Sequence, residues 1–206
     1  MAWVAEDLFN SYSDGDLNTL NGGSNFTAAW VADTAADVQG STINEGAKAI
    51  QFGAFATDGI ARRDFTAVTA GTMYFSVRLS QTDKELAFSL RESGTGRMFI
   101  RFGADGNIAI LDNASYTTIQ AYSADTWYRI GVDFDNSGQP NLYRANVDNG
   151  SFTAYKTVSG GSYTNVDRLQ FDFSAFASGG GFWDTISPNY DVTVATKKNL
   201  TLLGVG

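Results

Sequence analysis

Apolar and polar residues alternate with a period of two along several short segments of this chain of 206 residues. Successive side chains of a β-strand point to opposite faces, so this alternation predicts strands with one buried face and one solvated face. The segments are 73–79, 86–90, 98–102, 128–134 and 169–173. No long stretch keeps the apolar period of a helix, so little helix is expected.

Turn-forming dipeptides separate some of these segments. Asp105-Gly106 and Asn149-Gly150 each stand between two predicted strands. Both dipeptides tolerate the positive φ angles that two-residue hairpin loops require. The sequence shows no linker and no internal repeat. It therefore predicts one all-β domain over residues 1–206, built as an antiparallel sandwich of two sheets.

The sequence contains no His and no Cys. It therefore has no imidazole base, no thiolate nucleophile and no ligands for a soft metal. Without His, no side chain is expected to titrate near neutral pH unless burial strongly shifts the pKa of a carboxyl group. This composition favours a protein that binds a partner over one that catalyses a reaction.

The formal net charge is -8, and no basic stripe is found. Nucleic acids and anionic membranes are therefore not expected as partners. No segment approaches the roughly 18 apolar residues that span a bilayer. Residues Met1–Asp7 show neither the basic start nor the apolar run of a signal peptide, so we expect synthesis and folding in a host cytoplasm.

Several segments resemble the concanavalin A-like lectin/glucanase superfamily, in particular its laminin-G-like branch and members encoded by bacteriophages. Residues 6–30, 71–76 and 126–135 carry the likeness, which extends over nearly the whole chain. The resemblance implies a jelly roll of two curved antiparallel sheets with the first and last strands side by side. Residues near Glu6–Phe9 are then expected beside Leu200–Val205. A shared fold does not by itself imply a function.

Carboxylates along one strand are the catalytic signature of the enzymes in this superfamily, and its lyases commonly use a His. The chain has no His, and none of its Glu residues belongs to a Glu-x-Asp-x-Glu spacing. Asp133 and Asp135 alternate on one strand face but are better explained as residues that cap the turn at Ser137-Gly138. No catalytic residue is predicted, and the protein is expected not to be an enzyme.

The same two aspartates are weak candidates for calcium ligands. Calcium takes about six to eight oxygen ligands, and a lone Asp-x-Asp segment supplies too few of them. Asp133 and Asp135 would need oxygens from a second loop. No other cofactor is expected.

Arginine recurs on the polar side of separate predicted strands. If these strands share one sheet, the arginines and two neighbouring aromatic residues form one interaction face that suits a sugar or a protein partner. The alternative is a solvated face with cross-strand Arg–Asp pairs. The predicted face consists of Arg78, Arg91, Arg101, Trp127, Arg129, Arg144, Tyr155 and Arg168.

Aromatic residues outside the alternating segments suggest contacts between subunits. Phe182 and Trp183 follow a run of three glycines and are predicted to lie in an exposed loop, and Trp3 lies close to the start of the chain. Exposed aromatic surface of this kind is typical of interfaces. We therefore expect these residues to contact a neighbouring chain.

Two functions follow from these features. The first is a non-catalytic bacteriophage virion protein, such as a capsid decoration or cement protein or a tail-associated subunit. Its partners would be the major capsid or tail protein and further copies of itself. The alternative is a lectin-like carbohydrate-binding module that binds a glycan through the arginine and aromatic face.

Overall fold

The computed structural model describes residues 5–33, 36–53, 58–112, 115–135, 141–147, 154–158, 163–174 and 180–188, with only the backbone described for 141–147 and 154–158. These residues form strands β1 to β15 and no helix. None of them therefore belongs to a helix that could cross a membrane. The all-β prediction is confirmed.

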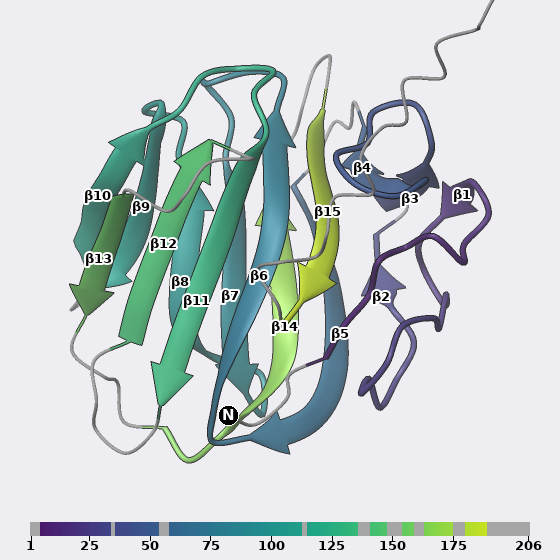
Figure 1. The fold of residues 1–206 in the computed structure, drawn as a ribbon, viewed down its shortest axis with the longest axis horizontal. Coiled ribbons are helices and arrows are strands. Elements are labelled where there is room, and N and C mark those ends of the chain that lie inside the picture. Colours follow the sequence, from purple (N-terminus) through teal and green to yellow (C-terminus); the bar gives the residue numbers. More distant parts are fainter. Residues whose placement is uncertain are drawn as a thin grey trace, which may run out of the picture.

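Two antiparallel sheets lie face to face (Figure 1). The eight-stranded sheet, in front in Figure 1, has the order β1 (Gly15–Asp16), β3 (Ala36–Gln39), β4 (Ala49–Phe52), β15 (Gly181–Ser187), β6 (Ala70–Leu79), β11 (Tyr128–Asp135), β12 (Asn141–Val147) and β13 (Ala154–Val158). The seven-stranded sheet has the order β10 (Ser115–Ala121), β9 (Asn107–Asp112), β8 (Thr95–Phe102), β7 (Leu86–Glu92), β14 (Val166–Phe173), β5 (Gly59–Val68) and β2 (Val31–Ala32). This is the predicted two-sheet sandwich.

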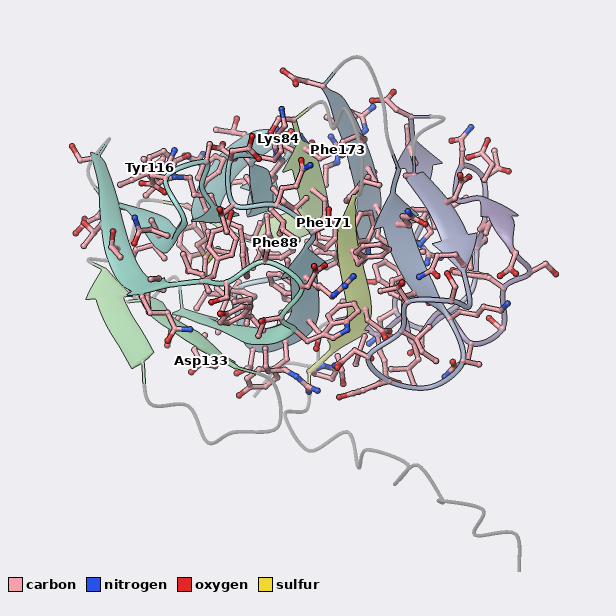
Figure 2. All side chains as sticks on the ribbon, turned by 90° about the horizontal axis from the view of Figure 1, so that it is seen from above. Lys84, Phe88, Tyr116, Asp133, Phe171 and Phe173 are labelled. Atoms are coloured by element: carbon pink, nitrogen blue, oxygen red, sulfur yellow. The ribbon has the colours of Figure 1, made fainter. Side chains whose placement is uncertain are left out.

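The five alternating segments all became strands, namely β6, β7, β8, β11 and β14. Their apolar residues point between the sheets, and Figure 2 shows Phe88 and Phe171 in this layer. The two rings lie 5.3 Å apart between centroids, and Phe75 of the opposite sheet meets Phe171 edge-on at 5.7 Å. Burying one such side chain contributes about 1.5–3 kcal/mol, so this aromatic layer stabilises the packing of the two sheets.

The predicted turn at Asp105-Gly106 joins β8 to β9, which pair antiparallel. Gly106 has a φ of 74°, in the left-handed region that glycine tolerates best. The turn at Asn149-Gly150 lies outside the described residues.

The N-terminal segment lies beside the last described strand. Asp7 pairs with Ile186 of β15 through two backbone hydrogen bonds of 2.8 and 2.9 Å. The predicted partner segment Leu200–Val205 lies outside the described residues.

A buried ion pair holds this segment in place. The Asp7 carboxylate accepts hydrogen bonds from Arg63 at 2.7 Å, Tyr12 at 2.7 Å and Trp30 at 3.2 Å. The other Arg63 donors bond to Ala28, Asn21 and Gly22. Burial, together with the neighbouring Asp7 charge, raises the pKa of Tyr12 to about 12. Arg63 belongs to β5, so this network ties the N-terminal segment to the seven-stranded sheet.

The structure corrects the predicted assembly contacts. Phe182 and Trp183 do not lie in an exposed loop but in β15, an interior strand between β4 and β6. Trp183 is fully buried and stacks on Phe171 with 4.1 Å between ring centroids. Phe182 is 6% exposed, with the Arg78 guanidinium 5.2 Å from its ring centroid. Neither ring is available to a neighbouring chain, and Trp3 lies outside the described residues.

Candidate functional site

The predicted interaction face is divided between the two sheets. Arg78, Arg129 and Arg144 belong to strands of the eight-stranded sheet, together with Tyr155 of β13. The other arginines, Arg91, Arg101 and Arg168, belong to the seven-stranded sheet. Because the outer surfaces of a sandwich face opposite directions, these residues do not form one face. The prediction of a single face is wrong.

The three arginines of the seven-stranded sheet share its outer surface, although Arg101 stands opposite Ala87, four residues along β7 from Arg91. They occupy neighbouring strands in the order β8, β7, β14, and Arg168 stands directly opposite Arg91. Their outward direction follows from the inward direction of the alternate residues in the same strands. We call the outer surface formed by Arg91, Arg101, Arg168, Asp64, Glu85, Asp172 and Tyr116 the arginine face.

Each of the three guanidinium groups has a carboxylate partner. Arg168 binds Asp64 through two contacts, Nε–Oδ1 at 2.5 Å and Nη2–Oδ2 at 3.2 Å. Arg101 Nη1 donates to Glu85 Oε2 at 3.1 Å. These carboxylates offset the repulsion between arginines that stand side by side.

Arg91 is held less tightly by its carboxylate. Its Nη2 lies 4.0 Å from Asp172 Oδ2, while its Nε and Nη1 donate to Ser89 Oγ at 3.1 Å and Gly94 O at 2.8 Å. Gln170 Nε2 donates to Asp172 Oδ1 at 2.6 Å. The arginine face therefore presents hydrogen-bond donors and acceptors that contacts with neighbouring side chains and backbone groups hold in place.

An exposed aromatic ring borders the arginine face. Tyr116, in the edge strand β10, is 42% exposed, and the Arg101 guanidinium lies 3.6 Å from its ring centroid. Figure 2 shows Tyr116 on the side of the seven-stranded sheet, away from the core rings. Partial burial, followed by the Glu85 charge, raises its pKa. Tyr116 was not among the predicted interaction residues, although it is an aromatic residue on the polar side of a strand.

An open hollow of about 710 Å³ adjoins this face at Glu85 and Asp172. Glu85 and Asp172 belong both to the arginine face and to the hollow, and the ring of Phe173 contributes apolar surface. A Cβ on Gly59 would lie only 2.3 Å from that ring, so the ring needs a glycine beside it. The volume is within the range of small-ligand sites. The lining residues are Asp33, Asp58, Gly59, Ile60, Glu85, Asp172, Phe173 and Ser174.

The outer surface of the eight-stranded sheet has a different character. Arg129 was predicted to be part of an exposed face, but it is 4% exposed and its Nη2 donates to Glu45 Oε1. Asp184 Oδ2 accepts the backbone N–H groups of Asn44 at 2.9 Å and Glu45 at 2.8 Å. We call Arg129, Glu45 and Asp184 the buried charge cluster. Chain segments far apart in sequence form it, which is why the strand pattern did not reveal it.

Because the chain has no His, only a carboxyl group with a strongly raised pKa was expected to titrate near neutral pH. Asp184 is such a group. Burial raises its pKa to about 7, against the lowering effect of hydrogen bonds from Asn44 and Thr185 and of the Arg129 charge. The Thr185 hydroxyl also donates to Glu45 Oε2 at 3.1 Å.

The remaining predicted residues have separate locations. Trp127 is half-buried just before β11 and lies 6.5 Å from the Phe182 ring centroid. The side chains of Arg144 and Tyr155 lie outside the described part of the structure. Asp133 and Asp135 lie on the outer side of β11, where Figure 2 labels Asp133. The described residues contain no group of three acidic side chains placed to share a metal, so calcium binding stays a prediction.

No family model matches the sequence, and no curated protein matches it. Solved structures do share the fold. Lectin II from Ulex europaeus is 12% identical with a TM-score of 0.56, and the match covers 81% of this chain and 93% of the lectin. A sialidase is 12% identical with a TM-score of 0.57, covering 77% of this chain but only 16% of the sialidase.

A carbohydrate esterase from the Shiga toxin-encoding bacteriophage phi24B is also similar, with 15% identity and a TM-score of 0.51. The match covers 77% of this chain and 88% of the esterase. These structures include a lectin and enzymes, so they show the fold and no more. The fold is the concanavalin A-like jelly roll that the sequence resemblance implied.

Proposed function

We propose that this protein is a non-catalytic, lectin-like carbohydrate-binding module that binds a glycan on the arginine face and in the adjoining hollow. The observation that carries the proposal is the exposed Tyr116 ring against Arg101, on the same face as the hollow. An aromatic ring offers an apolar surface to the C–H groups of a sugar. Fixed guanidinium and carboxylate groups offer donors and acceptors to its hydroxyl groups.

The ion pairs of the arginine face support binding more than they support folding. Half-exposed ion pairs contribute about 0–1 kcal/mol to stability, so the fold gains little from them. They do hold long side chains in one conformation before a ligand arrives. Side chains that are already ordered lose less entropy on binding, which favours affinity.

The location of Asp184 supports a non-catalytic role. Hydrolysis of a glycosidic bond needs a general acid with a raised pKa beside a second carboxylate at the substrate. Asp184 has a pKa raised to about 7, but it is buried on the outer surface of the opposite sheet, away from the hollow.

A structural role in a bacteriophage virion remains the other hypothesis. It rested in part on Phe182 and Trp183 as contacts between chains, and both are buried. A role as a capsid decoration or tail-associated subunit, and a location in the virion, stay predictions without a described contact surface.

The test is binding of the purified protein to an array of glycans, followed by titration with the best ligand. Tyr116→Ala should weaken binding at least about tenfold, since central aromatic anchors commonly contribute this much or more. Val31→Ala is the matched control, because Val31 is 48% exposed and belongs to β2, the opposite edge of the same sheet. Equal affinities for the two variants would overturn the proposed site.

A further inference from the structure

We infer that the arginine face and the hollow select an uncharged, hydroxyl-rich glycan over glycans that carry carboxylate, sulfate or amino groups. The inference rests on the proposed function and names the ligand class of the same site. Two features carry it, the pairing of the arginines and the distribution of charge around the hollow.

The arginines of this face are already committed to carboxylates of the protein. Bidentate arginine is the usual means of binding an anionic sugar. Here the fork of Arg168 holds Asp64, and Arg101 holds Glu85. An anionic ligand would have to displace one of these carboxylates, so it would exchange one ion pair for another and gain little net affinity at these arginines.

The hollow itself is acidic. Asp33, Asp58, Glu85 and Asp172 line it, on a chain with a net charge of -8. Like charges repel an anionic sugar at this end of the face. Sugar hydroxyl groups, by contrast, donate to carboxylates and accept from guanidinium groups, so an uncharged sugar satisfies both kinds of group.

A cationic amino sugar would be repelled by a positive charge at Tyr116. The Arg101 guanidinium already occupies the cation site over this ring, at 3.6 Å. A second cation placed against the same ring would lie close to Arg101 and be repelled by it. The stacked Arg101 and the Glu85 and Asp172 carboxylates beside it therefore favour an uncharged sugar, which neither kind of group repels.

Arg62 differs from the other arginines on this outer surface because no carboxylate of the described residues binds it. It lies on the outer side of β5, opposite Gln170, and makes no ion pair among the described residues. Asp64 lies two residues further along the same side of this strand, but both of its carboxylate oxygens are bound by Arg168, so it offsets the charge of Arg62 only in part. If an acidic glycan binds, Arg62 is the group through which it would bind.

The first experiment compares uncharged, sialylated, uronate-containing, sulfated and amino glycans on one array with the wild-type protein. Binding to uncharged glycans alone, with an affinity that changes less than about twofold between low salt and 0.5 M NaCl, is the expected result. Salt-sensitive binding to acidic glycans that Arg62→Ala abolishes would overturn the inference and leave the proposed function standing. Binding to no glycan would overturn both.

The second experiment uses the two glutamates at the ends of β7. Glu85→Gln removes the nearer carboxylate partner of Arg101 at the hollow and leaves, among the described residues, only Asp105, at 3.7 Å, whereas Glu92→Gln removes the partner of Arg97 at the far end of the strand. Both variants lose one negative charge. Glu85→Gln should gain affinity for acidic glycans by at least about tenfold over Glu92→Gln, because one charge-assisted contact becomes available. Identical behaviour of two folded variants would contradict the inference.

Discussion

The two outer surfaces of the sandwich use the same charged residue types in opposite ways. In the buried charge cluster of the eight-stranded sheet, Arg129 and Glu45 have side chains only 5% and 6% exposed. On the arginine face of the seven-stranded sheet, Arg168 and Asp64 are 24% and 41% exposed. The segment that contains Asn44 and Glu45 lies over the first surface and bonds to Asp184. The difference teaches that the chain segment covering a strand, rather than the sequence of the strand, decides the role of the charged side chains on it. Covered side chains stabilise the fold, whereas uncovered ones are available to a ligand.

This difference has an energetic consequence. Removing one partner of a buried ion pair leaves the other charge without compensation, at a cost of about 3–5 kcal/mol. Exposed pairs are solvated when broken and contribute about 0–1 kcal/mol. Substituting a charged residue should therefore lower the free energy of unfolding far more in the buried charge cluster than on the arginine face.

The largest expected effect is that of Arg129→Ala. It should lower the free energy of unfolding by about 3–5 kcal/mol, because Glu45 is left buried without its guanidinium partner. Arg168→Ala is the matched control on the arginine face and should cost no more than about 1 kcal/mol. Urea denaturation followed by circular dichroism measures both. Similar losses in the two variants would remove the distinction between the surfaces.

If Arg129→Ala does not fold, a double variant keeps the comparison testable. Arg129→Met with Glu45→Leu removes both charges and fills the space with apolar atoms. Replacing a whole buried pair in this way is often neutral. The double variant should therefore recover most of the stability that the single substitution loses.

The second prediction concerns pH. The folded-state pKa of Asp184 is about 7, against 3.8 for an ordinary Asp. Well below pH 3.8 both states are protonated, and as pH rises the unfolded state loses its proton before the folded state does. The contribution of Asp184 to stability is thus fully present at low pH and is lost up to pH 7, by as much as about 4 kcal/mol.

Asp184→Asn removes this titration and should leave the carbonyl oxygen to accept the two backbone N–H groups. The stability of the variant relative to wild type should therefore rise between pH 5 and 8. Urea unfolding at several pH values measures the difference. A difference that stays constant with pH would show that Asp184 is ionised throughout.

Much of the fold was predictable because alternation is a local property. A segment such as 169–173 reports its buried and solvated sides directly, and it became part of β14. The same pattern does not report which sheet a strand joins, so Arg129 and Arg168 were placed on one face although they belong to different sheets. Strand order depends on contacts between distant segments.

Two other features were hidden for related reasons. β15 does not alternate, because it is buried on both faces, so Phe182 and Trp183 were mistaken for loop residues. The hollow combines Asp33, Glu85 and Asp172, which come from three separate parts of the chain. The arginines of the site were identified from sequence, and cross-strand Arg–Asp pairs were predicted as an alternative, whereas Asp64, Glu85 and Tyr116 were not identified.

The smallest expected effect on stability is that of Arg101→Lys, which keeps the positive charge but loses the planar fork. The Glu85 contact and the stacking on Tyr116 both depend on the shape of the guanidinium group. Because this pair is partly exposed, the free energy of unfolding should change by less than about 1 kcal/mol. Glycan affinity should nevertheless fall several-fold, since a flexible ammonium group no longer fixes the Tyr116 ring and the Glu85 carboxylate. Titration with the best array ligand, alongside urea unfolding, separates the two quantities. A loss of stability without a loss of affinity would mean that the arginine face serves the fold, as the buried charge cluster does.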